Sequence, residues 1–460
     1  MLDNQTLIER AYTTQDELTQ ALSRAKVGQA LWQARPLAER KGLVAAAVAW
    51  LAAQQTQLAQ AITESIGRPQ AQAGGEVVGM AERAGYMLNV AEAALADVVP
   101  EAKAGFTRRI TRQPLGTVLL LAPWNYPLLT VINVLVPALV AGNVVLLKHA
   151  SQTTRLGDYF TAAFAAVGLP EGVFQQIFLS HQDTEFLVQQ PSIDFIAFTG
   201  SVATGRHLQR LTASRFVGMG LELGGKDPAY VRADANVADS ALQLAEGAFF
   251  NAGQSCCAVE RIYVHQSCYE AFVAAFVAEA KRLVLGDPRL PETTLGPMVS
   301  VAAATLVRGQ VQEACAAGAV ALLDEADFPA SQSGTAYLAP QVLVNVTHRM
   351  RVMTEESFGP VVGIMAVADD EAAIGLMNDS EYGLSASIWS ADSAAVAALA
   401  PRLACGTVLM NRCDYLDPAL AWTGVKDSGY GVSLSALGYG QLTRPQSHHF
   451  KTGLTQENNA

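Results

Sequence analysis

The chain has 460 residues and a formal net charge of −11, and 50% of its residues are hydrophobic while only 16% are charged. This composition excludes an intrinsically disordered chain, which combines low hydrophobicity with high charge. The length is enough for roughly two to four domains with well-buried cores. The acidic balance argues against a nucleic acid as partner, because binding phosphates requires a basic face.

In chain order, residues 1–90 are rich in Ala and Gln and have helical periodicity. Apolar residues at helical spacing predict a helix that ends at Gly67; they are Leu43, Ala47, Trp50, Leu51 and Leu58. Residues 128–147 form the most apolar segment. We predict a buried helix followed by a buried strand there, because Pro137 and Gly142 interrupt the run, and we expect no membrane contact.

From residue 115 onward, short apolar runs alternate with helical stretches. The runs read GTVLLLAP, NVVLLKHA, VFQQIFL and IDFIAFTG, and after residue 258 RIYVHQ, QVLVNV, VVGIMAV, SASIWS and GTVLMN. Continuous apolar strands separated by helices indicate parallel sheets covered on both faces, so we predict two α/β units. Residues 106–113, FTRRITRQ, alternate in polarity and predict an arm strand outside both sheets, and the tail QENNA is expected to be frayed.

The cysteines and histidines show no metal-binding pattern. The 6 cysteines contain no CxxC pair and the 7 histidines have no ligand spacing, so no metal is expected. Such sparse cysteine usage indicates a reducing compartment. The start of the chain lacks a basic region followed by an apolar stretch, so we expect no signal peptide and a cytoplasmic location.

One glycine-containing turn is a candidate phosphate site. Residues 197–205, AFTGSVATG, follow an apolar strand and open a predicted helix. Small residues such as Gly200 and Gly205 let backbone N–H groups approach a pyrophosphate at a helix N-terminus. The string matches neither a Walker loop nor the GxGxxG fingerprint, so a plain tight turn is the alternative.

Two further phrases carry candidate catalytic groups. NAGQSCCA (residues 251–258) has two adjacent cysteines, of which one can be a nucleophile while the other packs; the alternative is a pair of small buried hydrophobes. In ELGGKDP, Glu222 closes an apolar-rich run. A carboxylate on an apolar wall has a raised pKa and can act as a general base, and the alternative is a solvated loop acid.

Two strand ends carry polar residues. In APWNYP, Asn125 supplies an N–H donor for a negatively charged oxygen; as structure alone it would cap the next helix. Lys148 ends the run VVLLKHAS, at the edge where ligands bind in open α/β sheets; the alternative is a lysine that reaches solvent. EESFGPV indicates by itself only a turn.

Taken together and in this order, these phrases resemble the aldehyde dehydrogenase superfamily over residues 18–450. The matching motifs are APWNYP, the strand-end lysine, FTGSxxxG, ELGGK, GQxC, EExFGP, NDSEYGLSAS, GTVLMN and GVKDSG. The resemblance implies an α/β protein with a variant Rossmann-like cofactor domain, an α/β catalytic domain and a small β arm that bridges subunits of a homodimer or homotetramer. The implied boundaries are 1–99 and 116–223 for the NAD(P)-binding domain, 224–430 for the catalytic domain, and 100–115 with 431–460 for the bridging segments.

The resemblance also implies the chemistry, the oxidation of an aldehyde to a carboxylic acid. Cys256 is expected to form a thiohemiacetal and then a thioester, with Asn125 and the Cys256 backbone N–H holding the oxyanion and Glu222 activating the hydrolytic water. NAD or NADP is expected to accept the hydride. The matching cofactor positions are Trp124, Lys148, Ser151, Thr199, Gly200, Ser201, Leu223, Glu356 and Phe358. Lys148 and Glu356 are expected to take the ribose hydroxyls.

Ser151 departs from the family pattern, which often has an acid at this position. An acid accepts hydrogen bonds from the adenosine ribose and repels a 2′-phosphate. Ser151 removes that repulsion and offers a hydroxyl donor, so we expect NADP to be accepted, alongside NAD.

The expected substrate pocket contains Tyr126, Asn133, Phe250, Cys257 and Trp422. Relatives that oxidise carboxylate-bearing semialdehydes tend to carry Arg at the positions matching Asn133 and Phe250. Neither is Arg here, so we expect an uncharged aromatic or aliphatic aldehyde. The alternatives are a semialdehyde dehydrogenase, a coenzyme A-acylating relative and a non-catalytic scaffold; retention of Glu222 favours hydrolysis, and retention of the catalytic set argues against a scaffold.

Overall fold

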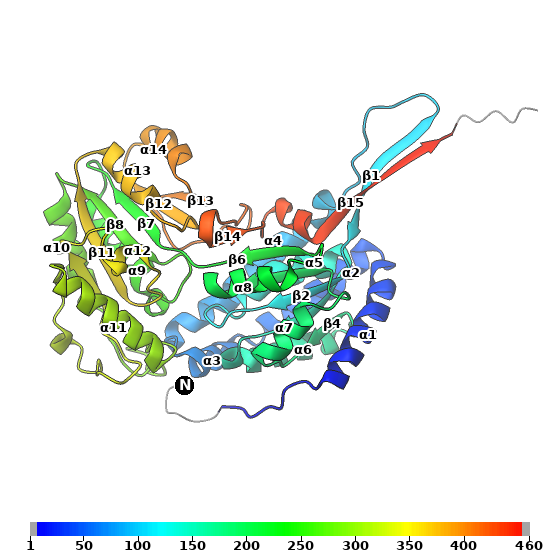
Figure 1. Cartoon of the computed structure of the whole chain (residues 1–460), viewed down its shortest axis with the longest axis horizontal. Helices are drawn as coiled ribbons and strands as arrows, with labels where there is room; N and C mark the ends of the chain where they lie inside the picture. The colour runs from blue at the N-terminus through cyan, green and yellow to red at the C-terminus, as the bar shows by residue number, and fades with distance from the viewer. Residues whose placement is uncertain (1–6, 453–460) are drawn as a thin grey trace, which may run out of the picture.

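The computed structural model describes residues 7–452, and the tail QENNA lies outside the described residues. Figure 1 shows two α/β bodies next to each other, with a two-stranded arm projecting from the first. Each body has its own hydrophobic core, one built mainly from residues 18–208 and the other from residues 229–403. The predicted α/β class with two units is confirmed.

Four helices precede the first sheet: α1 (Gln15–Gln33), α2 (Leu37–Ala52), α3 (Gln55–Ile66) and α4 (Gln70–Ala94). The predicted stop at Gly67 is confirmed, since this residue caps α3 with a φ of 79°, which glycine adopts without a Cβ clash. The single helix expected before it is wrong. The chain turns after Ala52, so α2 and α3 pack separately against α4.

The first sheet has the strand order β14-β6-β5-β2-β3-β4, and only β14 runs antiparallel to its neighbour. Its strands are β2 (Thr117–Leu121), β3 (Val144–Lys148), β4 (Phe174–Gln176), β5 (Phe195–Thr199), β6 (Gly218–Glu222) and β14 (Gly429–Tyr430). The helices after them are α5 (Leu129–Ala141), α6 (Thr154–Ala166), α7 (His181–Val188) and α8 (Val202–Thr212). Every residue of β2 is buried, as its continuous apolar run predicts for a strand covered on both faces.

The apolar segment at residues 128–147 is a buried helix followed by a buried strand, as predicted. It forms α5 and most of β3, with Pro137 inside the helix. Among residues 7–452, no helix combines the length and the apolar character needed to cross a membrane.

The second sheet has the order β13-β12-β7-β8-β11-β10-β9, in which only β9 is antiparallel. Its strands are β7 (Asp227–Val231), β8 (Val259–His265), β9 (Val320–Ala321), β10 (Gln341–Val344), β11 (Val361–Val367), β12 (Ser385–Trp389) and β13 (Thr407–Met410). The helices around it are α9 (Val237–Phe249), α10 (Tyr269–Ala280), α11 (Val301–Ala316), α12 (Arg351–Thr354), α13 (Asp370–Asn378) and α14 (Ser393–Leu399). Short 3₁₀ turns are η1 (Ser151–Thr153), η2 (Phe250–Gly253), η3 (Glu325–Asp327), η4 (Ala400–Arg402), η5 (Lys426–Ser428) and η6 (Ala436–Leu442).

The arm pairs β1 (Phe106–Pro114) with β15 (Thr443–Lys451) in antiparallel register. Neither strand joins the two larger sheets, so the strand predicted outside both sheets is confirmed. The polar alternation of β1 has its physical reason in this position, because most of the ribbon stands clear of both cores (Figure 1).

Candidate active site

Four neighbouring strands of the first sheet place predicted cofactor residues and the predicted base Glu222 along one edge. Lys148 ends β3, Thr199 ends β5 and Glu222 ends β6, while Trp124 follows β2. The register pairs Leu121 with Lys148 and Thr199 with Glu222, so these strand ends lie at one level. The carboxyl ends of parallel strands are where open α/β sheets bind ligands.

The N-terminus of α8 lies at the same edge. Ser201 caps this helix by accepting a hydrogen bond from the N–H of Thr204 at 3.3 Å. A Cβ on Gly205 would come within 2.8 Å of the Leu223 side chain, so this glycine permits close packing of helix and strand. Free N–H groups at such a helix start attract anions, which fits the pyrophosphate expected at Gly200 and Ser201.

Lys148 and Ser151 are available to a ligand. The Lys148 ammonium is partly buried, its one described hydrogen bond is 3.5 Å long, to the carbonyl of His149, and burial lowers its pKa. Ser151 is exposed and donates to Gln152 at 3.2 Å. A half-buried ammonium with unused donors at a strand end fits a bound ribose or phosphate.

The second body contributes Glu356 and Phe358 to the same site. The Glu356 carboxylate accepts a hydrogen bond from the N–H of Gly225 at 2.9 Å, and burial raises its pKa to about 7. The rings of Phe358 and Trp124 meet edge to face with centroids 5.6 Å apart, so residues of the two bodies are in contact here.

Sequence reasoning missed the buried ion pair behind this loop. Lys226 pairs with Glu260. Glu260 also accepts hydrogen bonds from the N–H groups of Ser357 at 2.8 Å and Phe358 at 3.0 Å, which fixes the EESFGP loop against β8. The signal was present as the lysine of ELGGK, although its distant partner could not be read from the sequence.

The loop that carries Cys256 is forced into an unusual backbone. Asn251 and Ala252 have left-handed φ values of 52° and 56°, and Gly253 follows with 68°. Left-handed backbone costs a non-glycine residue roughly 1–2 kcal/mol, and such strain concentrates at functional sites. The loop leaves Cys256 half-buried, while Cys257 is only 3% exposed.

Asn125 lies beside this loop and does not cap α5. Its Nδ2 donates to the carbonyl of Gln254 at 3.1 Å, whereas α5 starts at Leu129 without a side-chain cap. The alternative interpretation as a helix cap is therefore wrong. Pro127 and the turn at Leu128 separate the asparagine from the first helical residue.

A buried ion pair that the sequence did not reveal orients Asn125. Arg68 lies 2.5 Å from Glu76 and donates to the Asn125 carbonyl and, at 3.1 Å, to Asn251. Glu76 accepts from the N–H of Leu128 at 2.7 Å. The pair thereby holds the asparagine, the start of α5 and the nucleophile loop together.

Glu222 faces the site from the first sheet. Its carboxylate accepts hydrogen bonds from Ser433 at 2.5 Å and from Thr199 at 3.4 Å. Burial raises the pKa of Glu222 although both hydrogen bonds and the charge of Arg83 act in the opposite direction. A carboxylate with a raised pKa is suited to general-base work.

One cavity of about 730 Å³ unites the catalytic and substrate residues. Cys256 and Glu222 line it, and so do all of the predicted pocket residues, which are Tyr126, Asn133, Phe250, Cys257 and Trp422. The structure therefore brings the predicted site together, with Asn125 next to it. The roles of these residues stay predictions.

Besides the predicted Glu222, seven charged residues that the sequence analysis missed line this cavity: Arg68, Glu76, Glu82, Arg83, Glu246, Arg412 and Asp414. Arg83 Nη1 donates to Asn133 Oδ1 at 3.3 Å, and among the described residues it has no carboxylate partner. The expectation of an uncharged aldehyde rested on the absence of Arg at positions 133 and 250, and it overlooked this arginine from α4, which reaches Asn133. The detectable signal was a helical stripe of glycine, polar and charged residues, namely Gln72, Gly75, Glu76, Gly79 and Arg83.

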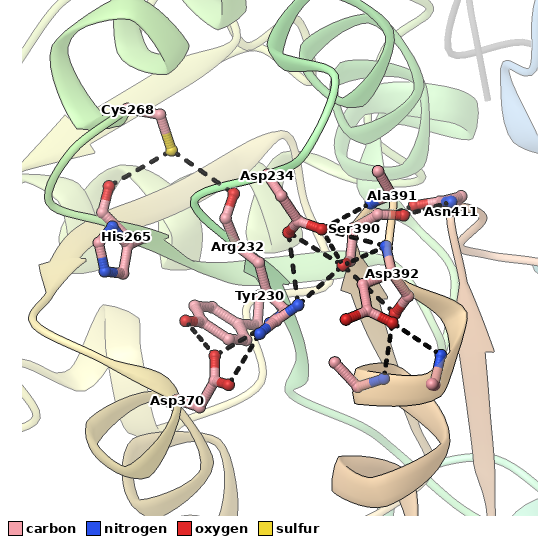
Figure 2. A network of polar contacts seen from close by, with 12 residues as sticks. Tyr230, Arg232, Asp234, His265, Cys268, Asp370, Ser390, Ala391, Asp392 and Asn411 are labelled. Carbon is pink, nitrogen blue, oxygen red and sulfur yellow. Dashed lines mark hydrogen bonds and ion pairs between the residues drawn. The ribbon is translucent and has the colours of Figure 1, made fainter.

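A polar network joins carboxyl ends of strands of the second sheet (Figure 2), and one of its members, Asn411, also lines the cavity. Arg232, after β7, pairs through two nitrogens with Asp370 at 3.0 Å and donates to Ser390 at 3.0 Å. Ser390 donates to Asp234 at 2.9 Å, and its N–H donates to Asn411 at 2.9 Å. With these groups satisfied by one another, the network is suited to holding strand ends together. Among the described residues, no Cys, His, Asp and Glu cluster could hold a metal ion.

The two-sheet fold, the strand-end edge with the Ser201-capped helix and the cavity that contains Cys256 and Glu222 are typical of a nicotinamide-dependent dehydrogenase. A sequence model of the aldehyde dehydrogenase family matches residues 2–447, and the chain belongs to this family. It is 34% identical to succinate-semialdehyde dehydrogenase (NADP(+)) 1 of Mycobacterium tuberculosis, over 92% of this chain and 93% of the relative. It is 33% identical to succinate semialdehyde dehydrogenase (NAD(P)+) Sad of Escherichia coli, over 94% and 93%.

A solved structure shows the same fold. Succinic semialdehyde dehydrogenase from Streptococcus pyogenes, in complex with NADP+ as the cofactor, superposes with a TM-score of 0.92 at 28% identity, over 97% of each chain. The predicted superfamily and α/β architecture are confirmed. These three relatives are named as semialdehyde dehydrogenases.

Proposed function

We propose that this protein oxidises a short aldehyde that carries a carboxylate at its far end, such as succinic semialdehyde, to the corresponding acid with NAD or NADP. The observation that carries the proposal is Arg83, which lines the same cavity as Cys256 and lacks a carboxylate partner among the described residues. A guanidinium in a largely buried setting favours an anionic ligand, because it otherwise stays charged without a counterion.

Arg83 and Asn133 together form a suitable carboxylate site. The hydrogen bond to Asn133 uses one of five guanidinium N–H donors, which leaves a fork for bidentate contact. Hydrogen bonds between charged partners contribute about 1.5–3 kcal/mol each. When the distal carboxylate of a short substrate is bound at Arg83, its aldehyde end extends toward Cys256, which lines the same cavity.

Cys256 then attacks the aldehyde carbon through its thiolate, forming a carbon–sulfur bond and a negatively charged oxygen. The backbone N–H of Cys256 and the second N–H of Asn125 Nδ2, which the Gln254 contact leaves unused, are the donors for that oxygen. NAD or NADP supplies the hydride acceptor. Glu222 takes a proton from the water that hydrolyses the remaining thioester and releases Cys256.

The cofactor residues favour acceptance of NADP. Ser151 is exposed beside Lys148 on the same strand-to-turn segment, and no carboxylate occupies position 151 to repel a 2′-phosphate. The support from similarity is that the Mycobacterium tuberculosis and Streptococcus pyogenes relatives are named with NADP and the Escherichia coli relative with NAD(P).

We further infer a homodimer or homotetramer in which the β1–β15 arm pairs with another subunit. The support is the arm's projection from both cores and its free strand edges, which favour pairing with another chain (Figure 1). A cytoplasmic location is supported by the cysteines, all 6 of which are unpaired.

The test is a substrate panel with wild-type protein and the Arg83→Met variant. We expect wild type to prefer succinic semialdehyde over hexanal and benzaldehyde in kcat/KM. Arg83→Met is expected to lower kcat/KM for the semialdehyde roughly 10- to 100-fold, mainly through KM, and to leave hexanal within about threefold. Product analysis with and without coenzyme A separates the free acid from an acyl-coenzyme A.

Arg24→Met is the matched control, since Arg24 lies on α1 outside this cavity. A wild-type preference for hexanal would contradict the proposed substrate class. If Arg83→Met lowers kcat/KM equally for hexanal and for succinic semialdehyde, the arginine has a structural role instead.

A further inference from the structure

Both neighbours of Cys256 are tied to a single oxygen atom. Ser255 Oγ donates to Asp414 Oδ1 at 2.8 Å, and Cys257 Sγ donates to the same atom at 3.0 Å. We propose that Asp414 is a positioning residue for the nucleophile, acting as the acceptor that fixes the loop on either side of Cys256. This inference rests on the proposed function, in which Cys256 attacks the aldehyde.

The effect of this double contact is on the backbone of Cys256. When the side chains before and after a residue are held at one point, the two peptide planes between them have little freedom to rotate. Cys256 itself makes no described hydrogen bond to Asp414, and it remains half-buried and lines the cavity shared with Glu222. The anchor therefore restricts the loop while leaving the nucleophilic sulfur available to the substrate.

Asp414 is itself held by the second sheet. It follows β13 on a left-handed turn, with φ values of 51° at Asn411 and 46° at Asp414. Asn411 donates to the carbonyl of Ser390 at 2.9 Å and accepts from the N–H of Ser390 at 2.9 Å, so this end of the Figure 2 network fixes the base of the turn. Non-glycine residues keep such backbone only where their surroundings determine it.

The chemistry of the anchor requires an acceptor rather than a charge. Burial raises the pKa of Asp414, and within residues 7–452 no lysine or arginine forms an ion pair with it. Contact with Cys256 and burial raise the pKa of Cys257 well above its ordinary range, so this thiol stays protonated and donates a hydrogen bond to Asp414. Cys257 thus acts as a tether and does not compete with Cys256 as a nucleophile.

The experiment compares Asp414→Ala with Asp414→Asn, which keeps a carbonyl oxygen of the same reach. We measure the pre-steady-state burst of NADPH formation with succinic semialdehyde, and the site of iodoacetamide labelling without aldehyde. Asp414→Ala is expected to slow the burst roughly 10- to 100-fold at nearly unchanged KM, because small misplacements of a reacting group cost about this much. Asp414→Asn is expected to stay within about threefold of wild type.

Labelling gives a readout that does not depend on catalysis. Wild type is expected to carry the label at Cys256, whereas Asp414→Ala is expected to gain label at Cys257 without gaining it at Cys268 or Cys405, which lie outside the cavity lining and report general loosening. Asp417→Ala is the matched control: Asp417 is exposed on the same segment and accepts from the N–H of Ala419. It should leave both readouts unchanged.

If Asp414→Ala does not fold, the double variant Ser255→Ala/Cys257→Ala removes both donors and is expected to slow the burst in the same way. An unchanged burst in Asp414→Ala or in the double variant would overturn the inference, as would an Asp414→Asn variant as slow as Asp414→Ala. These results are distinct from failure of the proposed function, in which wild type itself shows no burst or no labelling at Cys256.

Discussion

The two mainly parallel sheets place the site residues that were predicted from the sequence at different ends of their strands. In the first sheet, the candidate residues lie at or after the carboxyl ends of β2, β3, β5 and β6. In the second sheet, Cys256 precedes β8 and Glu356 precedes β11, whereas the carboxyl ends of β7, β8 and β12 carry the network of Figure 2. The carboxyl-end rule for open sheets therefore locates the cofactor edge of the first body but not the nucleophile of the second.

The difference reflects what each body must supply. The first sheet offers strand ends and a helix N-terminus, which suit an extended anionic cofactor. The second offers a strained loop, anchored from several directions, that holds one sulfur. Its strand ends are bound to one another, which stabilises the scaffold behind that loop.

The largest effect is expected from the base that the first sheet contributes. Glu222→Gln should lower steady-state turnover roughly 100- to 1,000-fold while the burst of reduced cofactor persists, because only deacylation needs this carboxylate. Since burial raises the pKa of Glu222 and its charged form is the base, wild-type deacylation should slow as the pH falls through that raised pKa. In the Glu222→Gln variant, the deacylation rate should no longer fall with pH in this acidic range.

Glu92→Gln is the control, because Glu92 is exposed on α4 and pairs only with Lys41 among the described residues. A Glu222→Gln variant that turns over at the wild-type rate would remove the first sheet from the chemical step and leave it a purely cofactor-binding body.

A smaller effect is expected at the adenosine end of the cofactor edge. Ser151→Glu should lower kcat/KM for NADP at least about tenfold relative to NAD, equivalent to about 1.4 kcal/mol, because a carboxylate repels the 2′-phosphate. Ser151→Ala separates the loss of the hydroxyl donor from the added charge. A large NAD preference in wild type, undiminished in Ser151→Ala, would contradict the assignment of this serine.

The smallest effect is expected at the carboxyl ends of the second sheet. Arg232→Leu should lower the melting temperature by about 2–4 °C and leave turnover within about twofold, since it removes hydrogen bonds to Asp370 and Ser390, which do not line the cavity. The Arg232 hydrogen bond lowers the pKa of Asp370, so this stabilisation is present at neutral pH and is lost as the pH falls below about 4. Thermal unfolding at pH 7 and at pH 3 measures both.

Arg402→Leu is the comparison, because the exposed Arg402–Glu371 pair should contribute almost nothing. Turnover that falls with Arg232→Leu as steeply as with Asp414→Ala would mean that the network acts in catalysis, and the contrast between the two sheets would fail.

Sequence reasoning reached the local features and missed the ones that depend on distant partners. Apolar runs predicted the strands, and ordered motifs predicted the family and the residues that line the cavity. Arg83 was missed because its significance depends on α4 packing beside Asn133, which no local pattern specifies. The Arg68–Glu76 pair and the Asp414 anchor were missed for the same reason: their partners, Asn125 and Ser255, lie far away in the chain.

The most direct test of the account is to trap the acyl group. Glu222→Gln protein is mixed with succinic semialdehyde and NADP, and the reaction is quenched in acid. The protein is then digested, and the mass of the peptide that contains Cys256 is measured by mass spectrometry. The account predicts a succinyl group on Cys256, formed in equal amount to the reduced cofactor, and neither product in Cys256→Ala. Reduced cofactor without an adduct on Cys256, or with the adduct on Cys257, would contradict it.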